Sequence, residues 1–165
     1  MQEQKLLKKL DSKMSTFPAL QCDDDLKQII KAAFDTDLDI NGAWGYTQDT
    51  ATNILSSSVP LSQFEHMFAS MRAYVEMNMT LAEEDRYGSI NLNEVAREQI
   101  TIGNLCYDKV SYEISAMNEK VYASFIKEYK EGYGTEGFDM TKHFEKRKEA
   151  TLKRNVTHWF EISSL

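Results

Sequence analysis

The chain has 165 residues, of which 42% are hydrophobic and 27% charged, and its net charge is −7. These values are typical of an ordered globular chain with a hydrophobic core, and they exclude a disordered or fibrous one. No stretch of 18 apolar residues occurs, and the charged start lacks the apolar segment of a signal peptide, so we expect neither a membrane span nor secretion.

The negative charge is concentrated in one part of the chain. Residues 15–115 contain six Lys and Arg against sixteen Asp and Glu, whereas residues 142–154 contain six Lys and Arg against two Glu. An acidic body repels phosphate backbones, so we expect no nucleic-acid binding and favour a basic protein as the partner. Without a secretory signal, Cys22 and Cys106 are expected to be free thiols, which favours a cytoplasmic location.

Helical patterns dominate the first third of the chain. Residues 2–14 predict a short helix, within a peripheral N-terminal segment 1–15. Asp23–Asp25 precede apolar residues spaced i, i+3, i+4 over 26–34, which predicts an amphipathic helix with an acidic start. We expect a loop next, and then a short helix from Thr47 to about Ser57.

The middle of the chain predicts one more helix and then strands. Capping-box spacing at 62–65, after Pro60, predicts a short helix. Apolar and polar residues alternate over residues 71–81, which predicts a strand. Residues 89–105 and 107–117 predict two more strands. Three successive strands joined by short polar turns predict an antiparallel meander with one buried face.

Two helices and a strand are expected at the end of the chain. Asn118 can cap a helix that ends at Gly132. Residues 139–154 predict a basic helix with little apolar surface. Residues 156–163 predict a last strand. The order of elements predicts a single α+β domain, with a small antiparallel sheet of about four strands and helices packed on one side.

The acidic loop at residues 35–48 matches half of a calcium-binding EF-hand loop. Oxygen-bearing side chains stand at loop positions one, three and five, with glycine at six: Asp37, Asp39, Asn41 and Gly42. Position twelve, however, is Gln48, and a neutral amide cannot provide the two carboxylate oxygens that an EF-hand uses there. Calcium or other metal binding at this loop is therefore a third-ranked alternative, and we assign no metal ligand.

No complete catalytic or cofactor motif is found. Gly132–Gly137 has the spacing of a dinucleotide-binding loop, but it follows a predicted helix where that motif needs a strand. The three histidines, His66, His143 and His158, have no metal-ligand spacing. We therefore expect no cofactor, assign no catalytic residue, and lean against an enzyme.

The same acidic loop also contains aromatic residues, which suit a protein interface. We predict that the partner-binding residues are Asp37, Asp39, Asn41, Trp44 and Tyr46. The favoured function is a small acidic binding protein that acts through protein–protein contact, as an inhibitor, an immunity protein or an adaptor does. The main alternative is a small enzyme or small-ligand binder with a pocket between sheet and helices. The sequence does not predict the oligomeric state.

Overall fold

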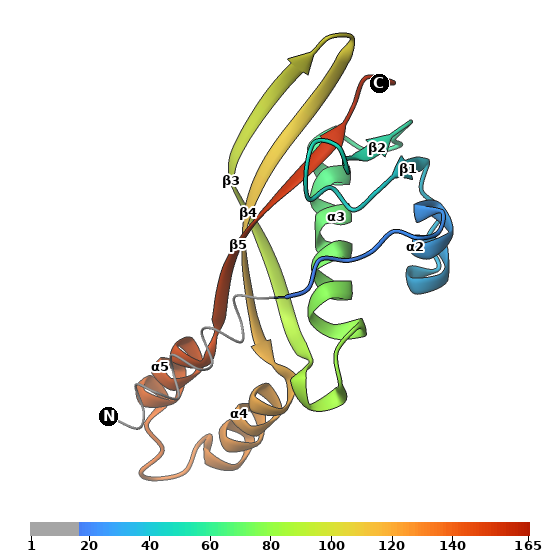
Figure 1. The fold of residues 1–165 in the computed structure, drawn as a ribbon. Helices are drawn as coiled ribbons and strands as arrows, with labels where there is room; N and C mark the ends of the chain where they lie inside the picture. The colour runs from blue at the N-terminus through green and yellow to red at the C-terminus, as the bar shows by residue number, and fades with distance from the viewer. Residues whose placement is uncertain (1–16) are drawn as a thin grey trace. The chain divides into compact units, whose positions relative to one another are not determined.

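The computed structural model describes residues 17–165 and contains helices and one mixed β-sheet (Figure 1). The five strands follow the order β1-β2-β5-β4-β3 across the sheet. Their bounds are Ile40–Gly42 (β1), Thr52–Ile54 (β2), Tyr87–Ile102 (β3), Leu105–Asn118 (β4) and Leu152–Glu161 (β5). The α+β class is thus confirmed. The helix predicted at 2–14 lies outside the described residues.

The sheet differs from the predicted antiparallel sheet of about four strands. β1 pairs with β2 in antiparallel fashion, with Ile40 opposite Ile54, but β2 and β5 are parallel, with Thr52 opposite Phe160. Parallel neighbours need a long crossover between them, and here all of α3 to α5 lies between the two strands. The last strand therefore joins the sheet between earlier strands, which local sequence patterns do not predict.

The helical segments begin and end largely where polar caps are placed. Their bounds are Leu26–Phe34 (α2), Leu61–Tyr74 (α3), Glu119–Gly132 (α4) and Met140–Ala150 (α5). Asp25 accepts a hydrogen bond from the Lys27 amide at 3.0 Å, and Asn118 accepts bonds from the first turn of α4. The caps predicted for α2 and α4 are therefore confirmed. No helix in residues 17–165 is long and apolar enough to cross a membrane.

The strand predicted at residues 71–81 is wrong, because this segment is helical. α3 continues into a π-helical segment, Val75–Met79. Burial follows the helical period, and the buried positions within residues 69–79 are 69, 72, 73, 76, 77 and 78. Two of these positions are Arg72 and Glu76, and charged residues on a buried helix face remove the apolar helical pattern from the sequence.

The short helix predicted from Thr47 to Ser57 is also wrong. A turn occupies this region, in which the Thr47 and Thr50 side chains bond each other at 2.8 Å, and β2 follows. Three apolar residues suggested a helix: Ala51, Ile54 and Leu55. Ala51 and Ile54 are buried, Ile54 within this strand, and Leu55 is half-buried. The spacing of three between Ala51 and Ile54 fits a loop that enters a short buried strand as well as it fits a helix.

The chain divides into two compact units, which we describe separately. The acidic unit comprises Pro18–Arg72, Leu92–Glu113 and Asn155–Leu165. The helical-hairpin unit comprises Ala73–Asn91, Ile114–Arg154 and Phe17 among the described residues. The acidic unit has five Lys and Arg against thirteen Asp and Glu, a net charge of −8. The described part of the helical-hairpin unit has ten Lys and Arg against eleven Asp and Glu, a net charge of −1.

An aromatic cluster forms the centre of the acidic unit. The Phe68 ring of α3 lies 6.0 Å from Trp44, 5.4 Å from His158 and 6.4 Å from Phe160, measured between ring centroids. Trp44, Phe68 and Phe160 are at most 2% exposed. This cluster joins the segment after β1, the face of α3 and the end of β5 into one core.

The helical-hairpin unit is packed more thinly between α4 and α5. No residue of α4 is buried, and His143 is the buried residue of α5. Its ring lies 5.2 to 5.8 Å from four aromatic rings: Phe125, Tyr129, Phe138 and Phe144. Phe144 is itself 47% exposed and Tyr133 63% exposed. Much of the aromatic surface of this unit therefore faces solvent.

Candidate functional site

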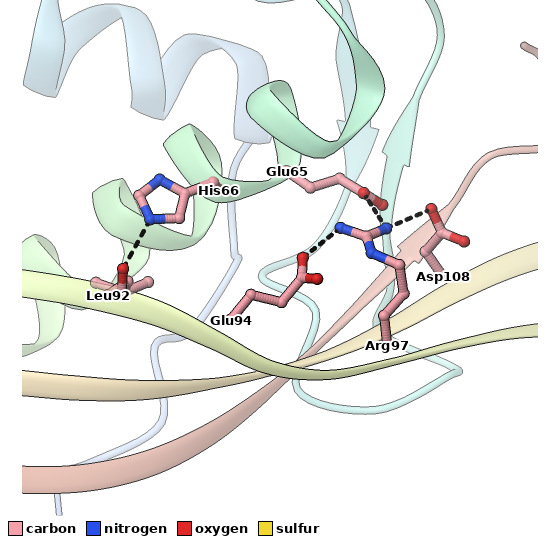
Figure 2. Close-up of polar contacts among 6 residues, drawn as sticks. All are labelled: Glu65, His66, Leu92, Glu94, Arg97 and Asp108. Atoms are coloured by element: carbon pink, nitrogen blue, oxygen red, sulfur yellow. Dashed lines mark hydrogen bonds and ion pairs between the residues drawn. The ribbon is translucent and has the colours of Figure 1, made fainter.

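The most unusual polar arrangement of the acidic unit is a charged cluster around Arg97 (Figure 2). Arg97 on β3 contacts Glu65 of α3 at 2.7 Å and Asp108 of β4 at 3.2 Å through one nitrogen. Through another nitrogen it contacts Glu94, on its own strand, at 2.6 Å. We call these four residues the Arg97 cluster. One guanidinium thus faces three carboxyl groups, which leaves an excess of negative charge.

The excess charge is relieved at Glu65. Its side chain is fully buried, and its Oε2 atom has no hydrogen-bond donor among the described residues. Burial, together with a hydrogen bond to Asp108, raises the pKa of Glu65 to about 8, although Arg97 opposes the change. When Glu65 is protonated, its carboxyl group is able to donate a hydrogen bond to Asp108.

Two further polar side chains lie around the Arg97 cluster. The Tyr112 hydroxyl is buried without a hydrogen-bond partner among residues 17–165, and burial raises the pKa of Tyr112. His66, next to Glu65 on α3, donates from Nε2 to the Leu92 carbonyl at 2.9 Å, as Figure 2 shows. His66 is therefore used to attach α3 to β3.

The chemistry of the Arg97 cluster is limited by access. A carboxyl group with a pKa near 8 is able to act as a general acid at neutral pH. The Glu65 side chain, however, has no exposed surface, and none of the cluster residues lines the pocket found in this unit. The cluster therefore joins α3 to the hairpin of β3 and β4. It was not predicted, because residues 65, 97 and 108 are far apart in the sequence.

His158 is the second buried titratable group of the acidic unit. Its Nε2 atom and the Thr52 hydroxyl are 2.9 Å apart, and its ring stacks on Phe160 at 4.0 Å. Complete burial, with Arg72 nearby, lowers the pKa of His158 well below its usual value, so the ring is neutral near pH 7. Its contacts place it within the core.

The five predicted partner-binding residues lie in different environments. Asp37, Asp39 and Asn41 are exposed, whereas Tyr46 is half-buried and Trp44 is only 2% exposed. A partner cannot contact the Trp44 ring without opening the core, so this residue cannot serve as a surface anchor in this conformation. The three polar residues remain predicted partner contacts.

Tyr46 is already engaged within the acidic unit. Its hydroxyl accepts a hydrogen bond from the Leu20 amide at 3.0 Å, and the Arg72 guanidinium lies 4.5 Å from its ring centroid. The aromatic residues that the sequence suggested for the interface thus hold the loop in place. Nothing in the local sequence distinguishes these two roles.

The polar side chains of the acidic loop contact other residues of the chain. Asp37 contacts Lys31 at 3.2 Å, and Asp39 accepts a hydrogen bond from Ser56 at 2.6 Å. Asn41 lies in β1 and accepts a hydrogen bond from Asn53 at 2.7 Å. Within residues 17–165, no group of three or more His, Cys, Asp or Glu side chains is placed to hold a metal ion.

Around this loop the acidic unit presents a strongly negative surface. Seven aspartates within residues 23–49 are exposed, and we call them the acidic surface: Asp23, Asp24, Asp25, Asp35, Asp37, Asp39 and Asp49. The same stretch contains two cations, Lys27 and Lys31. Comparison with known proteins found no matching family model, no matching curated protein and no matching solved structure.

Proposed function

We propose that the chain is a small binding protein that acts through contact between its acidic surface and a basic protein. The observation that carries this proposal is the separation of charge, with a net −8 in the acidic unit and seven exposed aspartates within 27 residues of chain. A field of this kind accelerates encounter with a cationic partner and repels acidic ones.

The aspartates of the acidic surface are only weakly neutralised by the chain itself. Lys31 contacts Asp35 at 3.3 Å and Asp37 at 3.2 Å, but these two carboxylates are 94% and 74% exposed. Exposed ion pairs contribute little to the stability of the fold. A basic partner can therefore replace Lys31 as the contact of these carboxylates at a small cost in free energy. An inhibitor, an immunity protein or an adaptor in the cytoplasm is the class of molecule that uses such a surface.

The proposal is tested by retention of proteins on the immobilised full chain at two salt concentrations. A cell extract of the source organism is applied at low salt, and the retained proteins are identified by mass spectrometry. We expect a basic protein that is released as salt is raised, because the screening length falls from about 10 Å at 0.1 M to about 3 Å at 1 M.

Two charge-matched variants make this experiment specific. One replaces Asp35, Asp37 and Asp39 by Asn, and the other neutralises the exposed triplet Glu83–Asp85 of the helical-hairpin unit. Each removes three negative charges, so both chains have the same net charge. Retention should be lost in the first variant and kept in the second. Equal retention by both variants, or retention that salt does not weaken, would overturn the proposal.

The enzyme alternative is supported by one observation, the raised pKa of Glu65. It requires a substrate to reach a carboxyl group of α3 that has no exposed surface. Contact through the acidic surface requires no such opening, and for this reason we favour the binding function.

A further inference from the structure

A shallow pocket of about 430 Å³ opens in the acidic unit beside the acidic surface. The turn between β1 and β2, the first residues of β4 and the end of β5 form its walls. Its volume lies within the range of sites that bind small molecules or single side chains. No Lys, Arg or His is among its lining residues, so the lining itself carries no positive charge.

Three lining residues present oxygen acceptors. Glu161 is held in place because its Oε1 atom accepts a hydrogen bond from the Ser163 amide at 3.2 Å. Asn53 donates from Nδ2 to Asn41, which leaves its carbonyl oxygen as an acceptor. Asp49, on the turn, is exposed and belongs to the acidic surface. The pocket therefore combines two carboxylates with an amide oxygen.

Tyr107 forms part of the pocket wall. It is only 6% exposed as a residue, and it brings an aromatic ring and a phenol oxygen to the lining. Leu105, 45% exposed, lies on the same wall and offers apolar surface.

We propose that this pocket receives an arginine side chain of the basic partner, an inference that rests on the function proposed above. Arginine carries five donors in a planar group, which suits carboxylates and an amide oxygen arranged around one space. Its aliphatic stem packs on Leu105, and Tyr107 provides both an acceptor oxygen and an aromatic ring. The negative charge of the lining residues favours a cationic side chain over a neutral one. The mixture of polar and apolar walls favours a long side chain, whose aliphatic part can contact the apolar wall.

The test is an NMR titration of the full chain, labelled with ¹⁵N, with N-acetyl-arginine-N-methylamide. N-acetyl-citrulline-N-methylamide, which has nearly the same shape without the charge, is the control ligand. We expect saturable shifts of the pocket amides, among them Gly42, Asn53 and Leu105, with the arginine probe. The citrulline probe should bind at least about fivefold more weakly, because charge-assisted hydrogen bonds are stronger than neutral ones.

Variants then assign the effect to the pocket. Glu161→Gln keeps the bond from the Ser163 amide and should weaken arginine binding about fivefold or more. Glu98→Gln, an exposed carboxylate of β3 outside the pocket, should leave the affinity unchanged. The inference is overturned by the absence of saturable shifts, by equal binding of both probes, or by a Glu161→Gln chain that binds as the wild type does.

These outcomes are separable from those of the proposed function. If the triple Asn variant at 35, 37 and 39 loses a basic partner but Glu161→Gln keeps it at full affinity, the acidic surface acts without the pocket. If the pocket binds the arginine probe but the full chain retains no basic protein, the proposed function fails while the site remains.

Discussion

The two units treat buried carboxyl groups differently. In the helical-hairpin unit Glu76 is 1% exposed and Arg154 contacts it at 3.3 Å. In the acidic unit Glu65 shares Arg97 with two other carboxyl groups. Burial and the neighbouring Asp108 raise the pKa of Glu65, although Arg97 opposes the change. The same excess of acid that perturbs the interior of the acidic unit also appears on its surface.

The units also differ in how they pack aromatic residues. Phe68 is fully buried in the acidic unit, whereas Phe144 is 47% exposed in the helical-hairpin unit. Phe68→Ala should lower the free energy of unfolding by about 3–5 kcal/mol, because it leaves a cavity in a closed core. Phe144→Ala should lower it by about 1 kcal/mol, since much of the ring never leaves water. Urea unfolding of both variants measures the difference, and equal losses would contradict the contrast.

A glycine comparison tests the close packing of the acidic unit by another route. A Cβ at Gly45 would overlap the His158 ring, whereas a Cβ at Gly134 would meet no atom within 4 Å, although both residues have positive φ. Gly45→Ala should therefore cost about 3 kcal/mol, through both overlap and backbone strain. Gly134→Ala should cost about 1 kcal/mol, through strain alone. If the two changes had similar effects in thermal unfolding, the region around His158 would be looser than the structure indicates.

The Arg97 cluster should respond to loss of its cation. Arg97→Met leaves the Asp108 carboxylate without a counter-charge and removes the hydrogen-bond donor to Glu65. It should destabilise the acidic unit by about 2–3 kcal/mol, somewhat less than a fully buried pair because Arg97 is partly exposed. The double variant Arg97→Met with Glu65→Gln should recover part of this loss. Additive effects in chemical denaturation would mean that Glu65 and Arg97 do not interact.

The pH dependence of stability isolates the proton on Glu65. Folded Glu65 keeps its proton up to about pH 8, whereas the unfolded chain releases it near pH 4.5, so stability falls as pH rises between these values. His158 acts oppositely, because the unfolded chain gains a proton below pH 6.5 that the folded core excludes. Below pH 6.5 the contributions of Glu65 and His158 to the pH dependence of stability oppose each other. Above pH 6.5 only the contribution of Glu65 remains.

We therefore expect the free energy of unfolding to fall by about 1–2 kcal/mol between pH 6.5 and 8. Glu65→Gln keeps a neutral donor next to Asp108 and should remove most of this slope. Denaturant unfolding at several pH values measures it. A variant with the same slope as the wild type would show that Glu65 is ionised throughout this range.

The sequence predicts elements whose patterns are local, and it fails where packing over long distances decides. Three predictions follow from nearby residues, and the structure confirms them: the helix at 26–34, the two successive strands at 89–105 and 107–117, and the cap at Asn118. The helix at 71–79 was missed because Arg72 and Glu76 occupy buried positions. A charged residue in a sequence is normally interpreted as exposed. Its burial can be recognised only when the residues that pair with its charge are known.

The candidate sites, like the fold, could be predicted only where the signal lies in neighbouring residues. The concentration of acid around Asp37 and Asp39 is visible in the sequence, and the structure places both side chains on the surface. The burial of Trp44 is not predictable locally, because Phe68 lies more than twenty residues away in the chain. The pocket is less predictable still, since its walls come from three separate segments.

The most direct test of the central claim is the dissociation constant of the retained basic protein, measured against salt concentration. It is measured for the wild type, for the triple Asn variant at 35, 37 and 39, and for the variant neutralised at 83–85. Binding through the acidic surface predicts a steep salt dependence in the wild type and in the 83–85 variant, and a weaker, flatter one in the Asn variant. Identical curves for the two charge-matched variants would show that net charge alone is responsible, and would contradict a defined binding surface.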